Sequence, residues 1–311
     1  MEEFRCPQTG EFQVPRTVLI SIREQLKSMI LRSGYVQVDE TFTKLIDPER
    51  RGRSHDAYLW GYMSPHEKAI VLEFSPSRGA AMLHQFFPAN WEGDIQSDGA
   101  RMYPAAFKHR PKVRRFGCMA HMRRKIVAAL KAHEVSMVPV YRDIRSLYRL
   151  ETLAESMQLT HVQRGHLRHL KAKPLLRRIQ RKLWDIRAKN PAARFGKLKE
   201  AVDYAYFNWR QLAAYARLGS GHIGIDNNPI ENCFRPTKIG LLNYKFIGDP
   251  KAGWVSAVMY SVLGTCRLLG VNPEEYLRWV LPQLAAGTNR TTASGLLPHD
   301  FARLQEPVSK P

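Results

Sequence analysis

Three acidic residues, Asp39, Asp98 and Glu231, have types and positions suited to phosphate chemistry. Asp39 ends the strand-like run YVQVD, and Asp98 follows a similar run in DIQSDG. Glu231 lies in IDNNPIENC, where a helix is predicted to begin. Carboxylates are ligands that Mg²⁺ prefers, and two such ions about 3.5 to 4 Å apart can flank a phosphate. Together, the three acids predict a two-metal site for phosphoryl transfer.

Each acid also has an ordinary structural interpretation. Asp-Gly is a common turn dipeptide, which applies to Asp98, and Asp39 can be a strand-exit residue. With Asn228 as N-cap and Pro229 as first helical residue, Glu231 takes the position of a capping-box carboxylate. A helix start also favours an ionised carboxylate, so capping and metal ligation are compatible at Glu231.

The elements that must position these acids follow from periodicity. Apolar residues at helical spacing predict a helix within 16–33, and the strand-like runs 35–39, 57–63 and 69–74 predict an antiparallel meander. In an alternating strand Tyr35, Gln37 and Asp39 share one face, while Val36 and Val38 point to the other. Asp39 is thereby predicted at a strand end near the centre of a sheet.

Strands and helices then alternate up to about residue 136, and residues 137–220 are predicted to be all-helical and very basic. This order predicts an α/β fold with a mixed sheet. The predicted division is a lead-in helix (1–33), the first part of a catalytic core (34–136), a basic helical insertion (137–220), the second part of the core with the Glu231 helix (221–248), C-terminal helices (249–285) and a polar tail (286–311).

The charge of the chain predicts a polyanionic partner. Lys and Arg number 48 against 28 acidic residues, a formal net charge of +20, which suits nucleic acid or an anionic membrane. We expect no membrane partner, because no apolar run approaches the spanning length and the start does not resemble a signal peptide. The protein is expected to be cytoplasmic.

Basic runs, which are ordinarily solvated faces, are here better candidates for contacts with nucleic-acid phosphates because cations exceed acids. Arg235, one helical turn after Glu231, suits either that carboxylate or a phosphate. Cys118-x-x-His121 is weak evidence for zinc and favours a structural or DNA-positioning role. The predicted DNA contacts are Arg114, Arg115, His121, Arg123, Arg124, Lys125, Arg177, Arg178, Arg181, Lys182 and Arg235.

From about residue 35 to 285, the sequence resembles the DDE transposases of the insertion sequence 66 family. The motifs that carry the resemblance include VDET (38–41), IQSDGARMY (95–103), GCMAHMRRK (117–125), IDNNPIENCFRP (225–236) and GVNPEEYLRWVL (270–281). The family's catalytic acids fall on Asp39, Asp98 and Glu231. The resemblance implies an RNase H-like fold, with a mixed five-stranded sheet flanked by helices and an all-helical insertion before the last catalytic helix.

The resemblance also implies the activity, which is cleavage at the ends of a mobile element and strand transfer into target DNA. The implied cofactors are two Mg²⁺ ions, for which Mn²⁺ can substitute. No nucleotide cofactor is implied. The expected partners are element ends and target DNA, together with further copies of this chain assembled on DNA, and the participation of helper proteins stays open. In the cell, such a protein is expected to associate with the nucleoid when bound to DNA.

One departure from the family pattern favours a rival hypothesis. Members usually carry an N-terminal region with a helix-turn-helix, a coiled coil and a zinc-binding module, and no counterpart is recognisable in this sequence. The expectation is a truncated or split copy with little preference for element ends. The rival is a catalytically silent, DNA-binding or regulatory remnant. Asn232 also stands where the family often has arginine, a change that we expect to be tolerated.

Overall fold

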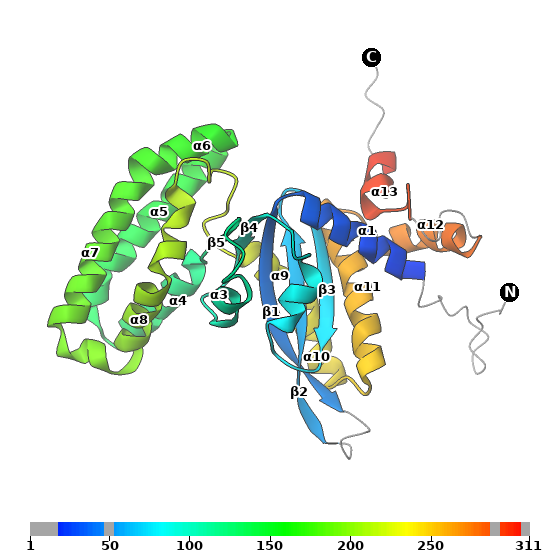
Figure 1. Ribbon diagram of the computed structural model, residues 1–311, viewed down its shortest axis with the longest axis horizontal. Coiled ribbons are helices and arrows are strands. Elements are labelled where there is room, and N and C mark those ends of the chain that lie inside the picture. The colour runs from blue at the N-terminus through cyan, green and yellow to red at the C-terminus, as the bar shows by residue number, and fades with distance from the viewer. Residues whose placement is uncertain (1–17, 47–52, 287–292, 306–311) are drawn as a thin grey trace. The chain divides into compact units, whose positions relative to one another are not determined.

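A computed structural model describes residues 18–46, 53–286 and 293–305 of the chain. They form two compact units, and Figure 1 shows their elements. The first unit comprises Met1–Trp91 and Ile230–Pro311, and the second comprises Glu92–Pro229. The predictions for residues 1–17 of the lead-in segment, and for 287–292 and 306–311 of the tail, lie outside the described residues.

The first unit contains the predicted meander and the helices around it. The predicted lead-in helix is α1 (Val18–Arg32), and Gly34 follows it with a φ of 69°, a left-handed conformation that glycine adopts readily. The other elements are β1 (Tyr35–Ile46), β2 (Ser54–Ser64), β3 (Ala69–Ser75), α2 (Ala81–Phe86), α10 (Arg235–Tyr244), α11 (Pro250–Leu269), α12 (Pro273–Ala285) and α13 (Pro298–Gln305). The short helix α9 (Asn228–Cys233) leads into this unit from the second.

Strands β1, β2 and β3 pair antiparallel in sequence order, so the predicted meander is confirmed. The predicted alternation in β1 is also correct, because Gln37 Nε2 donates to the Tyr35 hydroxyl at 3.1 Å and the two side chains share a face. Strand β1 is, however, much longer than predicted. Its ladder with β2 runs from Gln37 opposite Met63 to Ile46 opposite Ser54.

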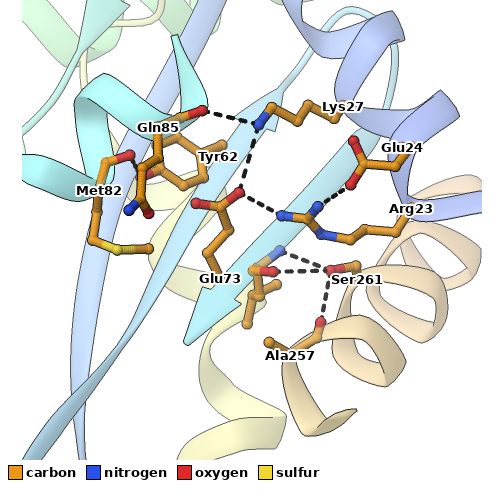
Figure 2. Close-up of polar contacts among 10 residues, drawn as sticks. Arg23, Glu24, Lys27, Tyr62, Glu73, Met82, Gln85, Ala257 and Ser261 are labelled. Atoms are coloured by element: carbon orange, nitrogen blue, oxygen red, sulfur yellow. Dashed lines mark hydrogen bonds and ion pairs between the residues drawn. The ribbon is translucent and has the colours of Figure 1, made fainter. Parts of the chain in front are cut away.

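Helices α1 and α11 both pack against β3 (Figure 2). From α1, Arg23 pairs with the buried Glu73, and Lys27 Nζ lies 3.8 Å from the same carboxylate. From α11, Ser261 Oγ accepts the N–H of Leu72 at 2.8 Å, and Thr265 Oγ1 accepts that of Ile70 at 3.2 Å. These hydroxyls satisfy backbone donors on the side of β3 that does not pair with β2.

Contrary to the sequence-based expectation, one described helix, α11, is long and apolar enough by length and composition to cross a membrane. Helices in the cores of soluble proteins also meet this criterion. The apolar character of α11 has a local explanation, because it buries Ala257, Val262 and Cys266 and bonds to the backbone of β3. Its composition therefore fits a helix that covers a sheet.

The C-terminal segment, predicted as a polar tail, contains helix α13. Its Phe301 packs beside two aromatic rings of α12, with ring centroids 5.9 Å from Tyr276 and 5.2 Å from Trp279. The Tyr276 hydroxyl also donates to the carbonyl of Leu296 at 2.7 Å. Apolar and polar contacts thus join this end of the described chain to α12.

The second unit begins with a parallel strand pair and continues as a helical region. Strands β4 (Gly93–Gln96) and β5 (Val113–Phe116) pair in parallel, with α3 (Met102–Ala106) between them in sequence. The remaining helices are α4 (Met119–Lys131), α5 (Val138–Ser156), α6 (His161–Leu167), α7 (Lys173–Lys189) and α8 (Gly196–Leu212). Segment 137–220 is therefore helical as predicted. With antiparallel and parallel strands and many helices, the described residues fit the predicted α/β class.

A buried arginine organises this helical region. Arg168 lies in a π-helical segment, Arg168–Ala172, between α6 and α7, and it is 0% exposed. Its guanidinium binds Glu151 of α5, with an Nε–Oε1 distance of 2.9 Å. Its Nη1 donates to the carbonyls of Ser220 at 3.0 Å and Ile223 at 2.8 Å. Arg168 thus fixes the segment that leads from α8 towards Glu231.

We expect Arg168→Met to lower the free energy of unfolding by about 3 to 5 kcal/mol, because Glu151 would be left buried without its counter-charge. Urea denaturation monitored by circular dichroism measures this loss. The matched control is Arg149→Met on the exposed face of α5, which should stay within about 0.5 kcal/mol of wild type. Equal stability of the two variants would contradict the assigned role of Arg168.

Candidate active site

Asp39 lies in the middle of a strand and not at its end. It is the fifth residue of the twelve in β1, half-buried, and its cross-strand partner is Gly61 of β2. The prediction of a strand-end position was wrong, because the polar segment after Asp39 continues to pair with β2. Thr41 and Thr43 are buried in that segment, while Lys44 is exposed, so the strand alternation persists beyond the apolar run.

Gly61 allows α9 to approach the sheet beside Asp39. A Cβ atom at Gly61 would lie 2.7 Å from Cζ of Phe234 and 3.2 Å from Cδ1 of Ile230, closer than side chains normally pack. Residues directly opposite each other in an antiparallel pair project to the same face. Asp39 therefore projects to the face on which Ile230 and Phe234 pack.

Glu231 follows Ile230 in α9 and is half-buried. Ile230 and Phe234 belong to an apolar cluster with Leu59, Met63 and Leu72, residues of β2 and β3. Ile230 precedes Glu231 in the sequence and Phe234 follows it, so the contacts of these two residues hold the Glu231 segment against the sheet. Asp39 and Glu231 consequently lie on the same side of the sheet in the first unit.

The start of α9 is capped differently from the prediction. The helix begins at Asn228, one residue earlier than expected, so Pro229 is its second residue. The carboxylate of Asp226 accepts the N–H of Asn228 at 3.1 Å and the hydroxyl of Tyr148 at 2.7 Å. Burial and the charge of Asp226 raise the pKa of Tyr148, which keeps that hydroxyl protonated as a donor. Asp226 was not predicted as a cap, although an Asp close to the start of a helix is a recognisable capping signal.

The segment before α9 is tied to the carboxyl ends of β4 and β5. Gln96, the last residue of β4, donates from Nε2 to the carbonyls of Gly117 at 3.1 Å and Gly224 at 2.8 Å. The N–H of Met119 donates to the Ile225 carbonyl at 3.2 Å. The buried Cys118 accepts the N–H of Asn227 at 3.2 Å. This bond fits the structural role, which is one of the two roles that the sequence favoured for Cys118.

Asp98 lies just beyond β4, as predicted, and is half-buried. Its Oδ1 accepts the N–H of Ala100 at 2.9 Å, so the turn interpretation is also correct. This bond uses one carboxylate oxygen. Asp98 shares a pocket with Tyr204 and Phe207 of α8, and burial and nearby negative charge, including that of Asp98, raise the pKa of Tyr204. Among the described residues, no ion pair joins Asp98 to a cation.

The adjacent Glu40 projects to the face of the sheet opposite Asp39, as the strand alternation predicts. Its carboxylate accepts from Arg78, with Nε at 3.0 Å, and its side chain is 6% exposed. This pairing gives Glu40 a structural role. Asp39 and Glu231 belong to the first unit and Asp98 to the second, so a centre that unites the three acids stays a prediction.

Of the predicted DNA contacts, Arg114 is engaged within the protein. Its guanidinium binds both oxygens of Asp94 at 2.6 Å, and Asp94 also binds Nε2 of His222 at 2.8 Å. Burial alone would raise the pKa of Asp94, but the hydrogen bonds from His222 and Arg114 lower it below its ordinary value. Arg114 therefore has a structural role besides any contact with phosphate.

The predicted DNA contacts on α4 and α10 differ in exposure and in their contacts within the protein. Arg123 and Arg124 are exposed, while His121 and Lys125 are partly buried. The Arg123 guanidinium lies 5.1 Å from the Tyr148 ring, and Lys125 Nζ lies 5.5 Å from that of Tyr204. Arg235 is exposed, and within the described residues no ion pair joins it to a carboxylate, which favours the phosphate alternative over a bond to Glu231.

On α7, the four predicted contacts divide into two pairs. Arg178 and Lys182 bind the same carboxylate of α5, Asp143, with Arg178 Nη2 at 2.6 Å and Lys182 Nζ at 2.8 Å. Arg177 and Arg181 are exposed. The second pair is therefore better placed to contact DNA.

We expect Arg177→Ala with Arg181→Ala to reduce the slope of log affinity against log salt by about 1.8, since each phosphate contact contributes about 0.9. Fluorescence anisotropy with a random duplex at several salt concentrations measures this slope. Arg178 and Lys182 are retained so that Asp143 keeps its partners. An unchanged slope would mean that α7 is a solvated face.

Comparisons with known proteins give two matching family models. A model described as transposase IS66 family matches residues 12–254, and one described as IS66 C-terminal element matches residues 261–299.

Two similar proteins come from Sinorhizobium fredii (strain NBRC 101917 / NGR234). The uncharacterized protein y4jD is 27% identical over 281 residues, which cover 85% of this chain and 53% of y4jD. For the uncharacterized protein y4qI the identity is 28% over 281 residues, which cover 86% of this chain and 50% of y4qI. The chain thus spans about half the length of these curated relatives.

Proposed function

Because the chain belongs to the IS66 family of transposases, we propose that it cleaves DNA at the ends of an insertion sequence and joins the freed ends to target DNA. The proposed metal ligands are Asp39, Asp98 and Glu231. The observation that carries this proposal is the contact of α9 with Gly61, since it puts Asp39 and Glu231 on the same side of one sheet. The proposed fold is RNase H-like, which suits an antiparallel meander followed by a parallel strand pair.

The chemistry of these acids fits hard divalent cations. Asp39, Asp98 and Glu231 offer only carboxylate oxygens, and all three are half-buried, which limits competition from water. Bound Mg²⁺ ions, or Mn²⁺ in their place, would neutralise charge on the scissile phosphate and increase the acidity of a coordinated water. No other cofactor is required, because phosphodiester exchange needs neither a redox change nor a nucleotide.

The reaction consists of two in-line displacements at phosphorus. In the first, a water oxygen bonds to phosphorus, the bond to the 3′-oxygen breaks, and that oxygen gains a proton to become a 3′-hydroxyl. In the second, the oxygen of this hydroxyl loses its proton and bonds to a target phosphorus, and the displaced 3′-oxygen of the target strand gains a proton. The three carboxylates would hold the metal ions, with Asp39 positioned by β1, Glu231 by the packing of α9, and Asp98 by its turn bond.

We further propose that the protein acts in the cytoplasm, associates with the nucleoid when bound to DNA, and assembles as several copies on element ends. A net charge of +20 supports a polyanionic partner.

Incubation of the full chain with labelled element ends, target DNA and Mg²⁺ or Mn²⁺ tests the proposed activity. We expect nicked ends and joined products that disappear when EDTA is added. If the chain binds DNA but forms no product with either metal, the silent DNA-binding remnant becomes the better description.

A further inference from the structure

The second unit contains a strongly cationic groove beside β5. It has a volume of about 800 Å³ and lies among α3, the loop after it, β5 and the end of α8. We call it the arginine groove, and its principal cations are Arg101, Lys108, Arg110, Arg115, Arg210 and Arg217. None of the described residues that line it is acidic. Such a concentration of one charge favours an anionic ligand.

The two walls of the groove are joined directly. The N–H of Gly117, after β5, donates to the carbonyl of Gln211 in α8 at 3.0 Å. A Cβ atom at Gly117 would lie 3.1 Å from the backbone nitrogen of Leu212, so strand and helix approach closely. The groove is therefore a preformed feature of the second unit.

Among the described residues of this unit, four arginines that line the groove have no carboxylate as an ion-pair partner. Arg114 has Asp94 as a partner, but no ion pair within residues 92–229 joins Arg101, Arg115, Arg210 or Arg217 to a carboxylate. Burial and the neighbouring charge of Arg210 lower the pKa of the Arg115 guanidinium. Two guanidinium groups near each other, without an acid, would be stabilised by a bound phosphate.

The arginine groove adjoins the pocket of Asp98. Arg115, Phe116 and Gln211 line both. We propose that the arginine groove binds the phosphate backbone of the DNA strand that approaches Asp98. This inference rests on the proposed function, which makes Asp98 part of the reaction centre.

The side chains of the groove favour recognition of the backbone over recognition of bases. Stacking on bases needs exposed aromatic rings, but Phe107 and Phe116 in its lining are only 5% and 4% exposed. Guanidinium groups bind phosphate oxygens in a bidentate manner without reading the sequence. We therefore expect the groove to bind DNA strands of any sequence.

Anisotropy titration of a labelled random duplex, in EDTA and at several salt concentrations, tests the binding. Arg115→Ala with Arg210→Ala should weaken binding roughly tenfold or more and reduce the salt slope by about 1.8. A second variant, Arg210→Ala with Arg217→Ala, changes only exposed side chains and should have a similar effect even if Arg115→Ala disturbs folding. The matched control removes the same charge elsewhere, with Arg278→Ala and Arg303→Ala, whose cations already pair with Glu274 and Asp300.

Photo-crosslinking tests the path to Asp98. Phe207 lines the Asp98 pocket and is 72% exposed, so a photoreactive phenylalanine can replace it in the full chain. We expect this side chain to crosslink to DNA, and the yield to fall several-fold in the Arg115→Ala, Arg210→Ala background. An unchanged yield, or a salt slope equal to that of the control variant, would overturn the proposal.

Competition experiments test the class of ligand. If polyglutamate of equal charge displaces the duplex as well as unlabelled DNA does, an acidic protein is the better ligand and the proposal fails. All binding measurements are made in EDTA, and hence do not depend on cleavage. A chain that fails to cleave but shows the expected groove effects would refute the proposed activity and leave the groove as a DNA-binding site.

Discussion

Conversion of any one of the three acids to its amide, Asp39→Asn, Asp98→Asn or Glu231→Gln, should reduce strand cleavage and strand transfer by about 10²- to 10³-fold or more. This is the loss typical when one preorganised group that stabilises developing charge is removed. The amide has nearly the same volume as the acid but lacks its charge, so metal binding is lost while packing is kept. Asp98→Asn also retains an oxygen that can accept the N–H of Ala100.

The matched control for this series is Glu40→Gln. Glu40 is the neighbour of Asp39 on β1 but projects to the other face, where it binds Arg78. Its amide should cleave at close to the wild-type rate. Cleavage rates are measured with DNA in excess, and DNA affinity is measured separately in EDTA, where all four variants should resemble wild type. Full activity of Glu231→Gln would show that Glu231 has a structural role only.

Substitution of Gly61 by alanine should disturb the site without changing any charge. The added methyl group would lie 2.7 Å from the buried ring of Phe234 and 3.2 Å from Cδ1 of Ile230 in α9, so we expect Phe234 and α9 to shift away from β2. Overpacking of this kind typically costs about 1 to 3 kcal/mol of stability. A displacement of about 1 Å at Glu231 can reduce cleavage by roughly 10²-fold.

Cleavage assays at a temperature where the Gly61→Ala variant stays folded separate its loss of stability from the effect of a displaced Glu231 on cleavage. Gly79→Ala is the control, because a Cβ atom there meets nothing within 4 Å, and it should leave both stability and cleavage near wild type. Since the space that the methyl group needs is occupied by Phe234, the double variant Gly61→Ala, Phe234→Leu should recover part of the lost activity. If Gly61→Ala alone cleaves like wild type, the packing of α9 does not position Glu231.

Local sequence determined most of the secondary structure, since periodicity depends on neighbouring residues. Apolar residues at helical spacing identified α1. Alternation placed Gln37 on the face of Tyr35, as their hydrogen bond confirms. The order of the elements also indicated the α/β class and the helical nature of segment 137–220. The sequence also supplied the family, because its motifs are contiguous and occur in a fixed order.

The extent of β1 was decided by tertiary structure. Residues 41–46 lack a strong apolar signal, and they become a strand because β2 pairs with them and because Ile247, some two hundred residues later, bonds to Lys44 and Ile46. A backbone donor gains a partner only when the chain folds back on it. This is why Asp39 lies in the middle of a strand, although the sequence predicted that the strand ends at Asp39.

The environment of the charged side chains also depended on contacts distant in sequence. The sequence predicted that Arg178 and Lys182 contact DNA phosphates. In the folded protein, both side chains instead form ion pairs with Asp143 of α5. Conversely, Arg115 and Arg210 are far apart in the sequence, and only the junction of β5 with α8 brings them to one groove. The sequence determined which residues can bind metal or phosphate, whereas the tertiary structure decided which of them already have partners, since electrostatic pairing depends on distance in space and not along the chain.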